Sequence, residues 1–101
     1  MDIRSALSLH NGTQMPRLGL GVWKCSGPEA ERSVHWALAA GDRHFDTARI
    51  YENEAQVGKA IRESGIPRGE IFVTTKLWND DHGYDAALKA FDLSLLTLGL
   101  E

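Results

Sequence analysis

The sequence predicts an α/β fold in which a leading β-hairpin is followed by about three βα units, the N-terminal portion of a (β/α)8 TIM barrel. Strand-like and helical segments alternate at about 25 to 30 residues, which implies right-handed crossovers and a parallel sheet covered by helices. Polar side chains follow the predicted strands, as they do at the active-site rim of a barrel. The 101 residues, 43% apolar, fit one domain at most, so we expect residues 1–101 to form a segment of an incomplete barrel.

The composition argues against several classes of partner. The chain has 11 basic and 14 acidic residues and a net charge of −3, without the basic excess that nucleic acid or a membrane surface favours. Cys25 is the single cysteine, so no internal disulfide forms, which fits a reducing cytoplasm. The first residues lack the apolar core of a secretory signal, and no apolar run approaches a membrane span. We therefore expect a cytoplasmic protein that binds neither nucleic acid nor membrane.

The first 41 residues are expected to hold a hairpin, a strand and a helix. Two short extended runs flank Asn11-Gly12, a residue pair whose tolerance of positive φ suits a tight turn. The apolar segment 18–23 is typical of a strand. A helix is expected next, because Pro28 suits a first helical turn, apolar residues recur at helical spacing, and Gly41 ends that pattern.

The rest of the chain alternates between strands and helices. We expect strands at 43–48 and 71–78, the latter rich in β-branched residues, and helices at 53–64 and 84–100. The last helix is expected to end near Gly99. The predicted order is hairpin, β, α, β, α, β, α.

A doubly wound dinucleotide-binding sheet is the competing interpretation of this alternation. Such a fold needs the pattern G-x-G-x-x-G after its first strand. Gly19 and Gly21 supply the first two glycines, but Lys24 occupies the third position. The barrel is therefore the preferred prediction.

An aspartate ends the second of the three parallel strands, where packing favours Val or Ile. A buried carboxylate costs several kcal/mol unless it is paired. Asp46 shares a strand face with His44, and Lys76 shares one with Thr74 and Phe72, because side chains alternate along a strand. If both faces point into a barrel, Asp46 and Lys76 lie on neighbouring strands at the same rim. We therefore expect Asp46 to be the counter-ion of Lys76.

Tyr51 follows Asp46 closely enough for the connecting loop to fold the phenol over the rim. A phenol with an ordinary pKa of about 10 donates a proton poorly at neutral pH, whereas a nearby cation stabilises the phenolate. A unit positive charge about 4 Å from the phenolate oxygen stabilises it by roughly 4 kcal/mol at an effective dielectric of about 20. Tyr51 as general acid, Lys76 as its tuning cation and Asp46 as the anchor of Lys76 form a proton-donating set.

Three stretches of the chain match motifs of a known enzyme family. Residues 41–61 are GDRHFDTARIYENEAQVGKAI, residues 72–78 are FVTTKLW, and residues 11–24 are NGTQMPRLGLGVWK. The first resembles the aldo-keto reductase signature around the catalytic Asp and Tyr, and the second resembles the strand that carries the catalytic Lys. The resemblance covers nearly the whole chain and implies NADPH-dependent reduction of small aldehydes and ketones on a (β/α)8 barrel.

The resemblance also implies roles for particular residues. By this likeness Asp46, Tyr51 and Lys76 are catalytic. Trp23 and Trp78, together with Tyr51, are expected to line the substrate pocket. The residues implied to lie beside the nicotinamide half of NADPH/NADP+ are Gly21, Val22, Trp23, Lys24 and Asp46.

Two departures from the family pattern are visible. Asp42 stands where the family usually has an aromatic or other bulky residue, at the strand end away from the chemistry, so we expect it to affect stability. The catalytic histidine of the family follows the fourth strand, which is expected beyond Glu101, and the adenosine phosphate site belongs to the C-terminal half.

Two hypotheses of different class therefore stay open. In the first, the chain is the N-terminal part of a reductase that is monomeric when complete, and activity belongs to the whole protein. In the second, it is a non-catalytic fragment that acts only by self-association or by complementing another chain. An open parallel sheet exposes unpaired edges and an apolar face, so the chain alone is expected to self-associate and to be inactive.

The histidines and one tryptophan are expected to have structural roles. His35 and Trp36 lie on the first predicted helix, with His35 at the surface and Trp36 in packing contacts. His10 is assigned to the hairpin and His82 to a loop. His44 is expected to be a hydrogen-bonded core residue.

Overall fold

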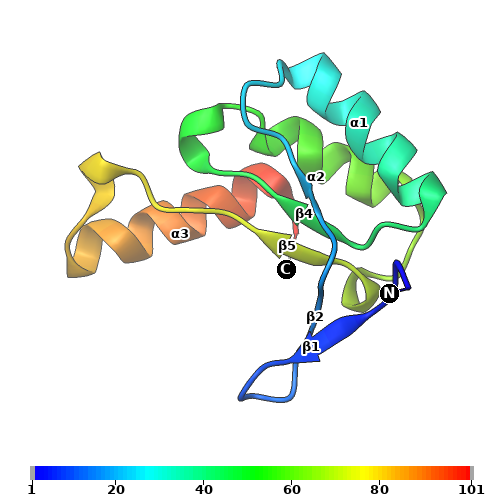
Figure 1. The fold of residues 1–101 in the computed structure, drawn as a ribbon. Coiled ribbons are helices and arrows are strands. Elements are labelled where there is room, and N and C mark those ends of the chain that lie inside the picture. The colour runs from blue at the N-terminus through cyan, green and yellow to red at the C-terminus, as the bar shows by residue number, and fades with distance from the viewer. Residues whose placement is uncertain (1, 101) are drawn as a thin grey trace.

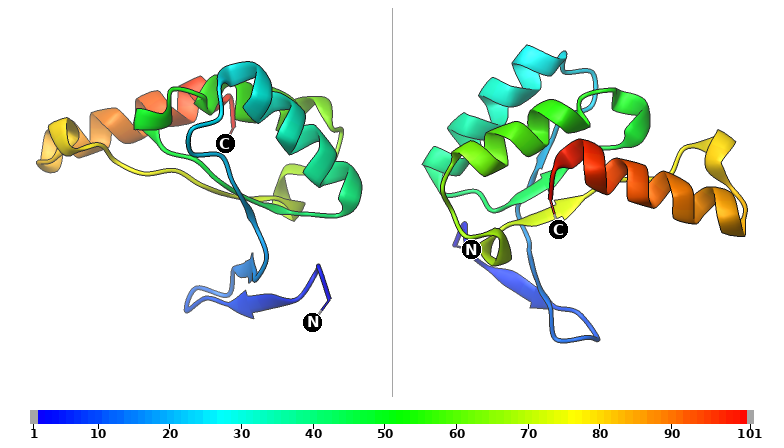
Figure 2. Two further views of the ribbon diagram at one scale, coloured as in Figure 1. Left: turned by 45° about the horizontal axis from the view of Figure 1, so that its top comes forward. Right: turned by 180° about the vertical axis from the view of Figure 1, so that it is seen from behind.

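The computed structural model describes residues 2–100, so Met1 and Glu101 lie outside it. An antiparallel two-stranded hairpin precedes a parallel three-stranded sheet, and three α-helices lie on one face of that sheet (Figures 1 and 2). The hairpin lies away from the helices in both figures. Within residues 2–100, the helices therefore cover only one face of the sheet.

The elements follow the predicted order. The hairpin strands are β1 (Ala6–Ser8) and β2 (Gln14–Pro16), and the parallel strands are β3 (Leu20–Gly21), β4 (His44–Asp46) and β5 (Phe72–Thr74). The helices are α1 (Gly27–Ala40), α2 (Glu54–Glu63) and α3 (Tyr84–Leu98), with single 3-10 turns η1 (Arg49–Tyr51), η2 (Arg68–Glu70) and η3 (Asn79–Asp81). The parallel strands are hydrogen-bonded in the order β3-β4-β5, so each crossover places a strand beside its predecessor.

The parallel strands are shorter than the sequence indicates. Regular pairing stops at Gly21, Asp46 and Thr74, which lie level with one another across the sheet. Beyond that level the backbone still pairs, because the Thr47 N–H donates to the Thr74 carbonyl at 2.8 Å. The loop after β4 therefore stays hydrogen-bonded to the end of β5 at the edge of the sheet.

The helix ends match the predicted signals. The Ser26 side chain accepts a hydrogen bond from the Glu29 N–H at 3.3 Å, and Pro28 lies in the first turn of α1. Gly41 ends α1 with φ of 103°, a left-handed conformation that favours glycine. The expectation that Trp36 packs is wrong for residues 2–100, because its side chain is 70% exposed on the outer face of α1.

The core lies between the sheet and the first two helices. Phe45 of β4 is fully buried against Val34 of α1 and Val57 of α2. Gly58 on α2 faces the backbone of Leu98 at the end of α3, so closely that a Cβ there would overlap it. This close approach fixes how the second and third helices meet.

The hairpin is attached to the sheet through a histidine. The His44 Nδ1 atom lies 3.0 Å from the Pro16 carbonyl oxygen, and its ring meets the Phe72 ring edge-on at 5.1 Å. His44 is therefore the hydrogen-bonded structural residue that the sequence predicts. Asp42 is buried, and its carboxylate accepts from the His44 N–H at 3.2 Å, so it stabilises the start of β4.

Several large apolar side chains of α3 face solvent. They include Leu88, Phe91, Leu93 and Leu96, each about half exposed or more. Among the described residues, no helix has both the length and the apolar character required to cross a membrane.

Candidate active site

The candidate site lies at the edge where all three parallel strands end. Gly21, Asp46 and Thr74 are in register there. The loops that follow these strands rise from the same edge, so side chains distant in sequence are brought together. A parallel sheet collects functional groups at its carboxyl edge for this reason.

An ion pair joins the ends of β4 and β5. Lys76 Nζ donates to the Asp46 carboxylate at 2.6 Å and to the Thr47 carbonyl oxygen at 3.0 Å. The predicted counter-ion of Lys76 is thus confirmed as a contact. Partial burial lowers the pKa of Lys76, but the Asp46 carboxylate, followed by the neighbouring Tyr51, raises it by more, so this pKa lies above its usual value. Lys76 is therefore a stable cation at neutral pH.

The Tyr51 ring lies beside this cation. Lys76 Nζ is 5.2 Å from the centroid of the ring, within the range of a cation–π contact. Tyr51 ends η1 and is half-buried, with its ring against the hydrophobic core. Glu52 follows in a left-handed conformation with φ of 57°, which turns the chain back into α2. The structure therefore brings Asp46, Tyr51 and Lys76 together.

A buried amide connects the two loops that flank the site. The Thr47 hydroxyl donates to Asn53 Oδ1 at 2.6 Å, and Asn53 Nδ2 donates to the carbonyls of Val22 at 3.1 Å and Cys25 at 3.3 Å. Asn53 and Thr47 are both fully buried. The buried Asn53 side chain therefore connects the loop after β3 to the loop after β4. The sequence pattern does not predict this role.

A second polar contact connects α2 to the end of β5. The Thr75 hydroxyl donates to the Glu54 carboxylate at 2.7 Å, and Glu54 is buried. Because Asn53 and Glu54 are adjacent, the start of α2 is bonded to the loops after all three parallel strands. In the sequence, an Asn-Glu pair at the start of a helix indicates only a cap and an acidic first turn, so it gives no signal for these contacts.

The two predicted pocket tryptophans lie in the loops that follow β3 and β5. Trp23 is 67% exposed, and Lys24 Nζ lies 4.8 Å from the centroid of its ring. Trp78 is half-buried and directly precedes η3. Within residues 2–100 no ring-to-ring contact joins either indole to Tyr51. The pocket role of both indoles therefore stays a prediction.

Open space adjoins Gly21 at this edge. A Cβ added to Gly21 would meet no atom within 4 Å, and Gly21 lies directly opposite Asp46. Val22 is fully buried, and its N–H and carbonyl are already hydrogen-bonded to Asp46, Cys25 and Asn53, so within residues 2–100 it presents no free surface to a ligand. The side-chain position of Gly21, opposite Asp46, is therefore unfilled within residues 2–100.

A cavity of about 710 Å³ lies at the opposite edge of the sheet. It is lined by hairpin residues such as Gln14 and by residues at the start of the strands such as Arg43 and Phe72. It contains none of the three clustered polar residues. This cavity is therefore the space between the hairpin and the amino-terminal edge of the parallel sheet.

Comparison with known proteins gives a consistent result. The family model described as the Aldo/keto reductase family matches residues 13–101. The chain is 55% identical over 98 residues to the 9,11-endoperoxide prostaglandin H2 reductase of Trypanosoma cruzi, covering 96% of this chain and 35% of that protein. It is 49% identical over 101 residues to the glyoxal reductase of Bacillus subtilis, covering 99% of this chain and 37% of the relative.

Solved structures agree in fold. An aldo/keto reductase from Brucella melitensis superposes with a TM-score of 0.92 at 56% identity, covering 96% of this chain and 37% of that chain. An aldo-keto reductase of Bombyx mori in complex with NADP superposes with a TM-score of 0.90 at 40% identity, covering 99% and 36% respectively. The chain spans about a third of the length of the curated relatives it matches.

These matches confirm the predicted fold class, because the three βα units and their hairpin correspond to the N-terminal portion of a (β/α)8 barrel. The carboxyl edge that carries Asp46, Tyr51 and Lys76 is then the edge where barrel enzymes place their chemistry. The chain belongs to the aldo/keto reductase family.

Proposed function

We propose that the complete protein containing this chain reduces small aldehydes and ketones to alcohols with NADPH, and that Tyr51 is the general acid. The observation that carries the proposal is the contact of Lys76 with both the Asp46 carboxylate and the Tyr51 ring face. Membership of the family, and the relatives named as reductases, support the same reaction class.

Each member of the cluster has a distinct task in this proposal. The Tyr51 hydroxyl donates a proton to the carbonyl oxygen as negative charge develops there. Lys76 stabilises the phenolate that remains, since a cation beside a phenolate favours the ionised form. Asp46 holds the Lys76 ammonium in place through the 2.6 Å hydrogen bond. NADPH, when bound, supplies the hydride that completes the reduction.

The residues at the strand edge fit the nicotinamide half of this cofactor. A Cβ at Gly21 would meet no atom within 4 Å, and the next exposed residues of this loop are Trp23 and Lys24. The Asp46 carboxylate still exposes part of its surface and can accept a hydrogen bond from a ligand hydroxyl. We further propose that Trp23 and Trp78 form walls of the substrate pocket once the remaining strands of the barrel are in place.

The proposal is tested with a Tyr51→Phe variant of a complete protein. This change removes one hydroxyl and keeps the ring that packs against the core. Carbonyl reduction is expected to fall by about 100-fold or more, the usual share of a general acid, while NADPH affinity stays within about twofold. Steady-state kinetics with an aromatic aldehyde measure the rate of carbonyl reduction, and a fluorescence titration with NADPH measures the cofactor affinity.

Tyr84→Phe is the matched control. Tyr84 is 84% exposed at the start of α3 and has no part in the cluster, so its variant is expected to retain full turnover. Undiminished turnover in Tyr51→Phe would refute the assignment of the acid.

A second candidate function is association of the 101-residue chain with another chain. The specific observation in its favour is the exposed apolar surface of α3 around Phe91 and Leu96, combined with a sheet whose second face no helix covers in residues 2–100. Sedimentation of the purified chain, together with NADPH-dependent turnover, separates the two candidates. The fragment hypothesis predicts oligomers without turnover. A monomer that turns over like an ordinary reductase contradicts it.

A further inference from the structure

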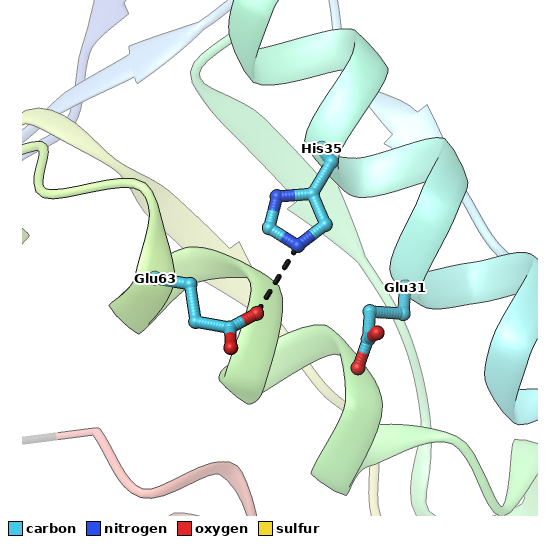
Figure 3. A group of neighbouring side chains, drawn as sticks. All are labelled: Glu31, His35 and Glu63. Atoms are coloured by element: carbon cyan, nitrogen blue, oxygen red, sulfur yellow. Dashed lines mark hydrogen bonds and ion pairs between the residues drawn. The ribbon is translucent and has the colours of Figure 1, made fainter.

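A cluster of metal-ligating side chains lies between α1 and α2, apart from the candidate active site. Glu31 and His35 are four residues apart on α1 and so share one helix face, and Glu63 reaches them from α2 (Figure 3). One ligand atom from each side chain lies within 4.8 Å of the other two. His35 and Glu63 are 39% and 50% exposed, so an ion can reach them from solvent.

We propose that Glu31, His35 and Glu63 form a binding site for a divalent transition-metal ion, with Zn²⁺ as its expected occupant in vitro. One imidazole nitrogen and two carboxylate oxygens are a ligand set that Zn²⁺ accepts, with water in the fourth position. Imidazole favours transition metals over Mg²⁺ and Ca²⁺, which take oxygen ligands. This proposal is independent of the carbonyl-reductase function.

The separation of the ligand atoms is close to what the ion requires. Tetrahedral ligands at about 2.1 Å from a zinc ion stand about 3.4 Å from one another. His35 Nε2 and Glu63 Oε1 already lie 3.2 Å apart, so an ion can replace the proton between them with little movement. Glu31 needs to close a gap of at most 4.8 Å by rotating its side chain.

A lysine on α2 already forms an ion pair with one carboxylate of this site. Lys59 Nζ lies 3.1 Å from Glu31 Oε1. The site thus attracts cations, and Lys59 competes with a metal ion for Glu31. Removing Lys59 is therefore expected to strengthen metal binding.

The measurement is isothermal titration of the purified, chelator-treated protein with ZnCl2, and with MgCl2 for comparison. We expect one Zn²⁺ per chain and no detectable heat with Mg²⁺. Substituting a ligand, as in His35→Gln or Glu63→Gln, is expected to weaken Zn²⁺ binding at least tenfold. Lys59→Gln is expected to tighten it by up to about fivefold, because an exposed ion pair no longer holds Glu31.

Matched controls keep the test specific. His10→Gln removes an exposed hairpin histidine and Glu29→Gln removes an exposed carboxylate of α1, and neither is expected to change Zn²⁺ affinity. Circular dichroism verifies that each variant is folded. The proposal is overturned if the wild-type protein does not bind Zn²⁺. It is equally overturned if His35→Gln and Glu63→Gln bind Zn²⁺ as tightly as His10→Gln does.

Discussion

Replacing Asn53 by alanine removes the amide that connects the loops after β3 and β4. Three hydrogen bonds are lost, one from the Thr47 hydroxyl and two to the carbonyls of Val22 and Cys25. Each contributes about 0.5–1.5 kcal/mol net, and buried groups left unpaired cost more. The Val22 carbonyl also accepts from the Cys25 N–H at 3.1 Å, so it keeps one partner. We therefore expect the free energy of unfolding to fall by about 2–4 kcal/mol.

The isosteric variant Asn53→Asp separates hydrogen bonding from packing. It keeps an acceptor for Thr47 but replaces the two amide donors by a carboxylate facing two carbonyl oxygens. Because a buried carboxylate that faces two carbonyl oxygens and has only one hydroxyl donor is costly, this variant is expected to lose at least as much stability as the alanine variant.

Urea unfolding followed by tryptophan fluorescence measures both changes. Asn79→Ala is the control, since Asn79 is exposed in η3 and its removal is expected to change stability by less than about 0.5 kcal/mol. A loss in Asn53→Ala no greater than that of the control would refute the view that this amide supports the site.

Two further predictions concern α2 and the ion pair. Gly58→Ala is expected to destabilise the protein by about 1–3 kcal/mol in urea unfolding, because its Cβ overlaps the Leu98 backbone, whereas Gly69→Ala enters open space and serves as the control. The folded-state pKa of Lys76 lies above the ordinary 10.5, so its contribution to stability is complete below that value and is lost as pH rises through the folded-state pKa. The stability advantage of the wild type over Lys76→Met is therefore expected to shrink above about pH 10.5, and a constant difference would contradict it.

Local signals were enough to predict the order of the elements. Asn11-Gly12, Pro28, Gly41 and Gly99 each act within a few residues, and each marks an observed turn or helix end. Strand lengths were overestimated because an apolar run continues past the last ladder bond. Segment 71–78, for example, leaves regular pairing after Thr74. The apolar pattern alone does not show at which residue the strand ends and the loop begins.

The site could be predicted only in part. The Asp46–Lys76 contact was predicted from strand alternation and from the position of both residues at the carboxyl ends of neighbouring strands. The role of Asn53 does not, because an Asn before a helix is usually a cap, whereas this side chain makes no capping bond and binds carbonyls some 30 residues earlier in the chain. The exposure of Trp36 was also missed, because helical spacing indicates a face but not what covers it.

The central claim is that Lys76 acts through Tyr51, and a double-mutant cycle on turnover tests it most directly. Tyr51→Phe, Lys76→Met and the combined variant of a complete reductase are compared with the wild type in kcat/KM for an aromatic aldehyde. Lys76→Met alone is expected to lower kcat/KM strongly. If the two residues act as a unit, adding Lys76→Met to Tyr51→Phe is expected to lower kcat/KM by less than about a further threefold. Losses that multiply in the combined variant would show that Lys76 serves the reaction without the phenol and would contradict the account.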